Sequence, residues 1–240
     1  MDKPVYKRAL IKISGEALAG EKGTGLDFTI LGDVADVIKK CADAGMQIAI
    51  VVGAGNIWRG VKNGVGKLDR ARSDHMGMLG TVINALALSD VLIQHGLDAR
   101  VQTAVEMRAF AEPFSRNDAI RHLENGRVVI FGCGTGCPFM STDTTAVLRA
   151  LETDCDVMLF AKNVDGVYDK DPAKYPDAKK YDALTYSEVL EKNLGVMDST
   201  AASMARDNNM PTLLFEVKKP ENIYRALMGE KIGTIVRKEI

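Results

Sequence analysis

Strong net charge, long apolar runs and paired cysteines are all missing from this sequence, and each absence excludes a class of protein. The 31 Lys and Arg residues nearly balance 32 Asp and Glu residues, so there is no overall basic field and nucleic acid is not an expected partner. No uninterrupted stretch of about 18 apolar residues occurs, which argues against a membrane span. Four cysteines, with no secretory segment at the start, favour a reducing cytoplasm over a disulfide framework. The remaining class is an ordinary globular chain with one sizeable core.

Short apolar runs typical of strands alternate with helical patterns along the chain, and this alternation predicts an α/β fold. The strand-like runs span residues 9–13, 47–52, 99–102, 128–131, 157–160 and 212–215. The helical candidates span residues 28–44, 73–94, 116–124, 141–152, 187–192, 198–208 and 222–228. Gly45, Gly96 and Gly126 follow three of these helices, where a left-handed residue often ends a helix. The longest break in the pattern, residues 165–181, is expected to be a surface loop or a lid.

The helical candidate at residues 73–94 carries apolar side chains around most of its circumference. Such a helix is either buried inside one chain or packed partly against another subunit. The eleven methionines of the chain would suit an adaptable contact surface. Both interpretations remain open at the level of the sequence.

The most informative stretch is residues 132–143, which follow a strand-like run and lead into a helix. Gly132, Gly134 and Gly136 let backbone N–H groups approach a ligand, and the start of the following helix favours an anion such as phosphate. The alternative is a tight turn that happens to be rich in glycine. Cys133 and Cys137 lack the further ligands of a zinc site, so we expect no metal there.

Two more glycine loops follow the first and second strand-like runs, at residues 14–17 and 53–60. Loops at the carboxyl ends of parallel strands gather at one edge of a sheet, so the three loops are expected to meet around phosphate-bearing ligands. The loops do not fit the standard nucleotide fingerprints. Glu21 follows Gly20 where a P-loop needs lysine, and Trp58 and Phe139 stand where a dinucleotide loop needs its third glycine.

Charged residues stand beside these loops. Lys12 lies in an otherwise apolar strand, where an ammonium group is costly to bury without an anion, so a functional role is favoured over a lysine that reaches solvent. Lys162 follows a later strand, and Arg59 lies within the second loop, where it could equally be solvated. Asp74 and Asp198 open helices, so each either caps its helix or acts in a site.

Several strings, in order along almost the whole chain, closely resemble the bacterial UMP kinases of the amino acid kinase family. They are Lys12-Ile13-Ser14-Gly15-Glu16-Ala17-Leu18, Gly53-Ala54-Gly55-Asn56 with Arg59-Gly60, Asp74-His75-Met76-Gly77-Met78, Gly134-Thr135-Gly136 with Pro138-Phe139, and Val164-Asp165-Gly166-Val167-Tyr168 with Asp171-Pro172. The resemblance implies a three-layer α/β/α sandwich with a mostly parallel central sheet, in a single domain over residues 1–240. It also implies that residues 1–153 are rich in UMP-binding positions and residues 154–240 in ATP-binding positions.

The same resemblance implies an activity, effectors and an assembly. Members of this group are expected to be cytoplasmic homohexamers that transfer a phosphoryl group from ATP to UMP in pyrimidine nucleotide synthesis, with Mg²⁺ carried by the nucleotide and no metal site of the protein's own. GTP is expected to activate and UTP to inhibit. The phosphate of UMP is already anionic near neutral pH, so this chemistry needs alignment and charge neutralisation but no general base.

Site residues carry over by matching motif. The ATP-binding residues implied are Lys12, Ile13, Ser14, Gly15, Gly55, Arg59, Lys162, Asn163, Tyr168 and Asp171. The UMP-binding residues implied are Ala54, Asp74, Thr135, Gly136, Cys137, Pro138, Phe139, Met140, Ser141 and Thr142. Lys12, Asp143 and Asp198 are expected to be catalytic, and Gly20, Glu21, Lys22, Gly23, Thr24 and Gly25 to form the segment for activation by GTP.

Three positions depart from the pattern of these kinases. Cys137 stands where Asn is usual, Met140 where an aromatic residue is common, and Ala54 where Gly is frequent. A cysteine lacks the strong donor and acceptor of an amide, so backbone amides would have to hold the acceptor there. Two rival functions remain: a sibling kinase that phosphorylates a carboxylate or carbamate, and a non-catalytic nucleotide sensor.

Overall fold

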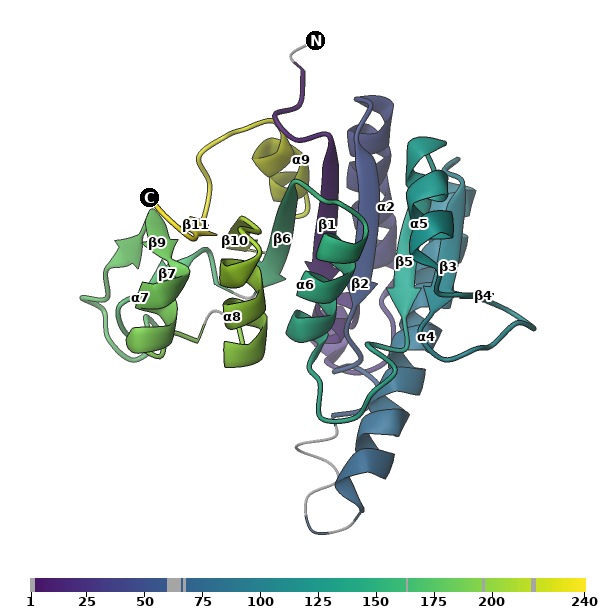
Figure 1. Cartoon of the computed structure of the whole chain (residues 1–240), viewed down its shortest axis with the longest axis horizontal. Coiled ribbons are helices and arrows are strands. Elements are labelled where there is room, and N and C mark those ends of the chain that lie inside the picture. Colours follow the sequence, from purple (N-terminus) through teal and green to yellow (C-terminus); the bar gives the residue numbers. More distant parts are fainter. Residues whose placement is uncertain (1–2, 60–65, 67, 163, 196, 217–218) are drawn as a thin grey trace.

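A nine-stranded, almost entirely parallel sheet organises the computed structural model, which describes residues 3–59, 66, 68–162, 164–195, 197–216 and 219–240 (Figure 1). In sheet order the strands are β4 (Glu112–Pro113), β3 (Ala99–Thr103), β5 (Val128–Gly132), β2 (Gln47–Val52), β1 (Arg8–Ile13), β6 (Val157–Lys162), β10 (Thr212–Glu216), β11 (Thr234–Arg237) and β9 (Ala183–Thr185). Within the described residues, β10 and β11 pair antiparallel and the other neighbours pair parallel.

Helices cover both faces of this sheet. In the described part of the chain they are α1 (Gly15–Leu18), the 3₁₀ helix η1 (Gly20–Lys22), α2 (Phe28–Asp43), α4 (Arg70–Gln94), α5 (Arg116–Glu124), α6 (Thr142–Glu152), α7 (Tyr186–Glu191), α8 (Ser199–Asp207) and α9 (Glu221–Leu227). One core cluster joins α2, α4 and α9 to one face of the sheet, and a second joins α5, α6, α7 and α8 to the other. The predicted three-layer α/β/α fold is confirmed.

The central strands are buried on both sides, and their side chains alternate between the two cores. In β1, Ala9, Ile11 and Ile13 face the α2–α4 side, whereas Leu10 faces the α6 side. Alternation places every second residue of a strand on the same face. Lys12 therefore points toward the α6 side, like Leu10, at the carboxyl end of the strand.

Glycine residues end several of these helices, and an aspartate caps the start of α4. Gly45, Gly96 and Gly126 have φ of +87°, +83° and +73° after α2, α4 and α5, the left-handed conformation that glycine adopts without a Cβ penalty. Asp69 caps α4 by accepting a hydrogen bond from Arg72 N at 3.1 Å. The interpretation of Asp74 as a helix cap is therefore wrong, because the helix already begins at Arg70.

The expected loop at residues 165–181 contains regular structure. Strands β7 (Val167–Tyr168) and β8 (Lys180–Tyr181) pair antiparallel within it, so the prediction of a plain loop or lid needs this correction. Two-residue strands are too short to show the alternation that reveals a strand in a sequence.

Helix α4 is, by length and composition alone, long and apolar enough to cross a membrane. This finding corrects the expectation that the chain contains no candidate membrane span, which was drawn from the lack of uninterrupted apolar runs. Half of its most apolar window is buried inside the fold, and a buried core helix passes the same test. Met76, Leu79, Ile83 and Ile93 are nevertheless 40–52% exposed, so the all-round burial suggested by the sequence is not reached within one chain.

The order of the strands contains one topological switch point. The chain builds β2, β3 and β5 on one side of β1 and then crosses over to β6 and β10 on the other side. In open parallel sheets a crevice for ligands forms at the carboxyl ends of the strands where the order reverses. The ends of β1 and β6 define that position in this molecule.

Candidate active site

Two lysines and an aspartate meet at the switch point. Lys12 is the penultimate residue of β1 and Lys162 is the last residue of β6, both on the same face of the sheet, and Asp143 comes from the first turn of α6. The Nζ of Lys12 lies 3.0 Å from Oδ1 of Asp143, and the Nζ of Lys162 lies 3.8 Å from its Oδ2. The three side chains are 12%, 22% and 17% exposed, respectively. We call this group the lysine cluster.

The lysine cluster carries two ammonium groups for one carboxylate. Burial lowers the pKa of Lys162, and the neighbouring Lys12 lowers that pKa further, whereas the charges of Asp143 and Asp198 favour the protonated ammonium. Positive charges held close together in a poorly solvated place are stabilised by an added anion. The cluster is thus suited to an anionic group such as a transferring phosphate.

One cavity of about 510 Å³ opens beside the cluster, between α4, the start of α6 and the start of α8. We call it the α4–α6 cavity. Its lining includes these predicted UMP-binding residues: Ala54, Asp74, Thr135, Cys137, Phe139, Met140, Ser141 and Thr142. Gly136 and Pro138 belong to the same loop but do not line the cavity. Gly55, Arg59 and Asp198 line it as well.

The loop of residues 132–141 forms one wall of this cavity and is tied to α4 at both ends. Cys133 N donates to Thr81 Oγ1 at 2.7 Å, and Phe139 N donates to Asp74 Oδ2 at 2.8 Å. Cys133 and Phe139 have φ of +66° and +67°, a conformation that non-glycine residues hold only when their surroundings impose it. The glycine-rich stretch is therefore a loop whose shape is fixed by its contacts with α4.

Asp74 joins the wall to the helix. Arg70 Nε donates to both carboxylate oxygens of Asp74 at 2.9 Å, and the guanidinium of Arg70 lies 5.4 Å from the centre of the Phe139 ring. In this structure the Asp74 carboxylate is therefore engaged with Arg70 and the wall. Its predicted contact with UMP stays a prediction.

Asp198 performs the capping role that the sequence allowed for it. It caps α8 by accepting from Ala201 N at 3.0 Å. Its carboxylate also accepts from Thr144 Oγ1 at 3.2 Å and from Ser141 Oγ, both at the start of α6. Asp198 therefore fixes the starts of α6 and α8 relative to each other.

Ala54, one of the departures from the pattern of the family, lies against Gly80 of α4. A Cβ added to Gly80 of α4 would lie 2.9 Å from the Cβ of Ala54. The methyl group of Ala54 thus occupies the space that a side chain at position 80 would need.

A second cavity of about 360 Å³, the β7–β8 cavity, lies against Lys162 of the lysine cluster. Lys162, Tyr168 and Asp171, all predicted to bind ATP, line it. The Tyr168 hydroxyl donates to Asp165 Oδ1 at 2.7 Å, which lowers the pKa of that carboxyl. Because Lys162 lines this cavity and Thr142, next to Asp143, lines the α4–α6 cavity, the lysine cluster connects the two.

The remaining predicted ATP residues lie in the loops that follow β1 and β2. Ile13, Ser14 and Gly15 lead from β1 into α1, and Gly53 N donates to Ile13 O at 2.9 Å, so the two loops are in contact. Arg59 forms an ion pair with Glu16 and donates through Nε to Gly55 O at 3.2 Å. Asn163 lies outside the described residues.

Gly15 is required by the closeness of these loops. A Cβ built there would lie 2.4 Å from Asn56 Oδ1 and 2.6 Å from Gly55 N. We expect Gly15→Ala to lower the free energy of unfolding by about 1–3 kcal/mol, as overpacking does, and to lower activity with it. Urea unfolding measures this change. Gly32→Ala in α2, where the nearest atom is 3.9 Å away, is the matched control, and equal stability of both variants would contradict the close contact.

The predicted GTP-activation segment, residues 20–25, is half-buried at Gly20 and exposed from Glu21 to Gly25, and it lines neither of the two cavities described above. It touches the β2 loop, because Gly25 N donates to Asn56 O at 3.1 Å. Its predicted role is not tested by this geometry.

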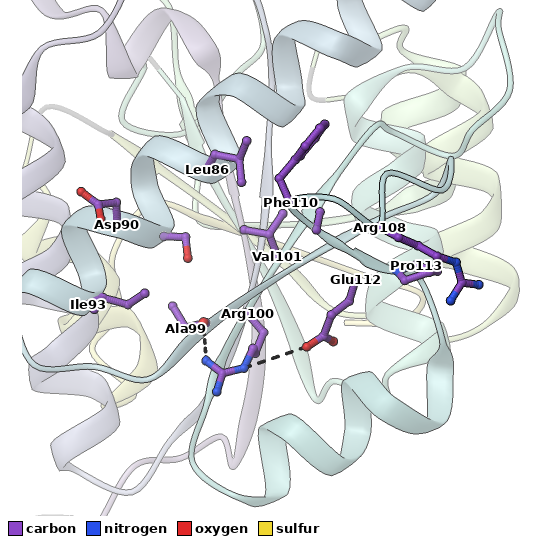
Figure 2. A pocket seen from close by; sticks show the side chains of 12 residues that line it. Leu86, Asp90, Ile93, Ala99, Arg100, Val101, Arg108, Phe110, Glu112 and Pro113 are labelled. Atoms are coloured by element: carbon purple, nitrogen blue, oxygen red, sulfur yellow. Dashed lines mark hydrogen bonds and ion pairs between the residues drawn. The ribbon is translucent and has the colours of Figure 1, made fainter.

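A larger cavity, about 590 Å³, lies away from the glycine loops between α4 and the strands β3 and β4 (Figure 2). We call it the α4–β3 groove. Leu86 and Ile93 of α4 line it opposite Phe110, and Arg100 lies 3.9 Å from Glu112 at its floor. None of the site residues predicted from the sequence lines this groove.

Several residues of the α4–α6 cavity were not assigned from the sequence. They are Trp58, Arg70, Gly77, Met78, Thr81, Gly134, Thr144, Thr145, Ser199 and Thr200. Arg70 stands four residues before Asp74, and this helical spacing of opposite charges could have marked it. Trp58, whose Nε1 donates to Ser73 Oγ at 3.1 Å, has no comparable signal.

The fold and the lysine cluster define a phosphotransferase, and comparison with known families agrees. A model of the amino acid kinase family matches residues 7–216. The chain belongs to the amino acid kinase family and is a kinase, so the resemblance found in the sequence is confirmed.

Solved structures extend this result over the whole chain. A UMP kinase from Bacillus anthracis is 41% identical, with a TM-score of 0.94, covering 98% of this chain and 97% of its own. A UMP kinase from Ureaplasma parvum is 38% identical with a TM-score of 0.91, over 99% and 100% of the two chains. A uridylate kinase from Archaeoglobus fulgidus is 29% identical with a TM-score of 0.74, over 95% and 99%.

Proposed function

We propose that the chain transfers the γ-phosphoryl group of ATP reversibly to UMP, giving ADP and UDP, in the pyrimidine nucleotide synthesis of the cytoplasm. The observation that carries the proposal is the lysine cluster lying between two cavities. A kinase needs such an arrangement, since donor and acceptor must meet at one positively charged point. The UMP kinases among the solved relatives supply the choice of acceptor.

The β7–β8 cavity is the proposed place for the nucleoside end of ATP. Tyr168 and Asp171 would hold that end, and Lys162 would direct the phosphates toward Lys12. The loops around Gly15 and Gly55 would then lie along the phosphate chain. This proposal keeps residues 154–240 as the part of the chain rich in ATP-binding positions. The loops that follow β1 and β2 would supply the remaining contacts with ATP.

The α4–α6 cavity is the proposed place for UMP. Thr135, Ser141 and Thr142 line it with hydroxyl groups, whereas the N–H groups of Cys133, Cys137 and Phe139 in the wall are bonded within the protein. Arg59 lines the same cavity, so we propose that it serves phosphates on both sides of the transfer.

The chain's own residues supply alignment and charge. A phosphate monoester carries about −1.5 to −2 charges at pH 7, so an oxygen of the UMP phosphate can attack the γ-phosphorus without a general base. A bond forms from that oxygen to the γ-phosphorus, while the bond to the β,γ-bridging oxygen breaks and ADP leaves. Lys12 and Lys162 would stabilise the charge on the transferring group, and Asp143 holds the two ammonium groups in place beforehand.

Mg²⁺ is proposed to arrive with ATP. Among the described residues, no group of three His, Cys, Asp or Glu side chains is placed to form a metal cage. Mg²⁺ is commonly held by one or two carboxylates together with substrate phosphates and water, and Asp143 and Asp198 are the carboxylates that fit this mode. When bound, the ion would neutralise phosphate charge.

One assay tests the function directly. ADP release is measured with ATP, Mg²⁺ and, separately, UMP, CMP, dUMP, glutamate, aspartate and carbamate. We expect UMP to give the highest rate. A response to an amino acid or carbamate without UMP would establish the sibling kinase instead, and no release with any acceptor would favour the nucleotide sensor. Adding GTP or UTP to the UMP reaction tests the proposed activation and inhibition.

Cys137 gives a chemical test of where UMP binds. It is the exposed member of the four free cysteines, and burial raises the pKa of Cys41 and Cys155 to about 12, which keeps those thiols protonated. We expect iodoacetamide to modify Cys137 first and UMP to slow that reaction severalfold, as followed by mass spectrometry. The variant Cys137→Ser is expected to lose the fast modification by iodoacetamide. Protection by ATP but not by UMP would place the acceptor elsewhere.

A homo-oligomer, expected to be a hexamer, is part of the proposal. The exposed residues Met76, Leu79 and Ile83 of α4 and the half-buried Leu86 follow the alternating three- and four-residue spacing of helix-pairing seams, and the exposed Ile93 follows seven residues after Leu86. We call this set the α4 apolar stripe. A stripe of this kind on a monomer is typical of a subunit contact, the second interpretation that the sequence left open.

Disrupting the α4 apolar stripe is expected to reduce the mass of the assembly. Ile83→Glu puts a charge into the middle of the stripe, which is costly to bury against an apolar partner. Light scattering coupled to gel filtration measures the mass. Gln94→Glu, on the same helix but off the stripe, is the control. A wild-type chain that is already monomeric would refute the oligomer.

A further inference from the structure

Two buried side-chain amides join the β2 loop to the middle of α4. Asn56 is 4% exposed and Asn84 is 0% exposed. Asn56 Nδ2 donates to Asn84 Oδ1 at 3.0 Å, and Asn84 Nδ2 donates back to Asn56 Oδ1 at 2.8 Å. We call them the Asn56–Asn84 pair.

The remaining hydrogen bonds of the pair go to the backbone of two loops. Asn84 Nδ2 donates to Gly53 O at 2.7 Å, and Asn56 Nδ2 donates to Gly25 O at 2.6 Å. Buried amides stabilise a fold little more than apolar groups of the same size, but they require one geometry, since each unpaired group would carry a large desolvation penalty. The pair therefore specifies the shape of the loops more than the strength of the packing.

The geometry specified by the pair includes the loop beside Lys12. Asn56 Oδ1 lies so close to Gly15 that a Cβ there would be 2.4 Å away. The pair thus determines how near the β2 loop, with Gly55 and Arg59, comes to the β1 loop that follows Lys12. The same pair holds Gly25, the last residue of the exposed segment 20–25.

We infer that Asn84 is a positioning residue for phosphoryl transfer. It touches no substrate, and it acts through Asn56 and Gly53 by holding the β2 loop against the β1 loop. This inference rests on the proposed function. By holding the two loops together, Asn84 keeps their backbone amides aligned with the lysine cluster before the substrates bind.

The test compares Asn84→Ala, Asn56→Ala and the double variant in the wild-type background. For each, kcat, the KM values for ATP and UMP, and the thermal midpoint are measured. We expect each single variant to lower kcat about tenfold or more, the effect of lost alignment, at temperatures where the variant is fully folded. The double variant is expected to lose clearly less than the product of the two single losses, because either change breaks the two bonds between the amides, and only the bonds to Gly53 O and Gly25 O are lost separately.

Ser89→Ala is the matched control, because Ser89 is a buried hydroxyl of α4 away from the β2 loop. It is expected to keep the kcat of the wild type. A merely structural role of Asn84 would lower the thermal midpoint and leave kcat unchanged in the folded protein, which would overturn the inference. Additive losses in the double variant would overturn it too. If Asn84→Ala does not fold, Asn56→Ala decides by the same criterion.

The two failures are distinguishable. A wild-type chain that does not phosphorylate UMP refutes the proposed function, and the variants are then compared with whichever acceptor of the panel is active, or by isothermal titration with ATP if none is. A wild-type chain that is active on UMP, with variants of unchanged kcat, refutes the inference alone.

Discussion

Lys12→Ala is expected to lower the turnover of UMP by about a hundredfold to a thousandfold, the usual loss when a preorganised charge-stabilising group is removed. Lys12 stands at the carboxyl end of the central strand, with its ammonium 3.0 Å from Asp143. Alanine removes one of the two positive charges that the transferring phosphate would meet. Coupled detection of ADP at saturating ATP and UMP measures the change.

Folding must be separated from chemistry in that experiment. Asp143 keeps Lys162 as an ion-pair partner in the variant, so the fold is expected to survive, and circular dichroism checks it. Lys7→Ala, at an exposed lysine just before β1, is the control and is expected to retain full turnover. Near-normal turnover of Lys12→Ala would remove this lysine from the mechanism.

Asp143→Asn is expected to have the second largest effect. The isosteric amide keeps the shape of the side chain but no longer separates the charges of Lys12 and Lys162. Turnover is expected to fall by about tenfold to a hundredfold, because the two ammonium groups lose their alignment. ADP release measures this effect, with Asp43→Asn as the control, an exposed aspartate that pairs with Lys39 in α2.

The pH dependence of Asp143→Asn has a definite sign. Burial and Lys12 already lower the pKa of Lys162, and Asp143 opposes this lowering. Removing the carboxylate lowers that pKa further, so Lys162 loses its proton at a lower pH. The alkaline fall of kcat is therefore expected to begin at lower pH in the variant than in the wild type. An unshifted or upward-shifted alkaline limb would contradict the role of the carboxylate.

Much of the fold was predictable because its elements leave local patterns. The long strands are apolar runs, the helices repeat at helical spacing, and glycines such as Gly45 and Gly96 mark where helices end. The short strands β4, β7, β8, β9 and β11 were missed, since two to four residues show no period. The start of α4 was misplaced at residue 73, because Asp74 was taken to open the helix, whereas the helix begins at Arg70 with Asp69 as its cap.

The candidate site, like the fold, could be predicted from the sequence only in part. The glycine loops and Lys12 were visible in the sequence, because glycines after strands and a lysine within a strand are locally unusual. Arg70 and the Asn56–Asn84 pair were not visible as parts of the site. The spacing of Arg70 from Asp74 could have marked Arg70, whereas the role of the pair depends on side chains that meet between α4 and the β2 loop, and no local pattern encodes that meeting.

The sequence by itself determined the family, the order of the long strands and helices, and the glycine loops proposed to bind phosphate, because motifs and periodicities are properties of neighbouring residues. Tertiary structure decided which charges meet. Lys12, Asp143 and Lys162 come together because β1 pairs with β6 in one register and α6 begins beside that pair. It also decided which face of α4 is buried and which carries the apolar stripe. Both outcomes depend on packing through space between segments that are distant in the sequence. Lys12 and Lys162, for example, are more than a hundred residues apart, and no local sequence pattern encodes their meeting.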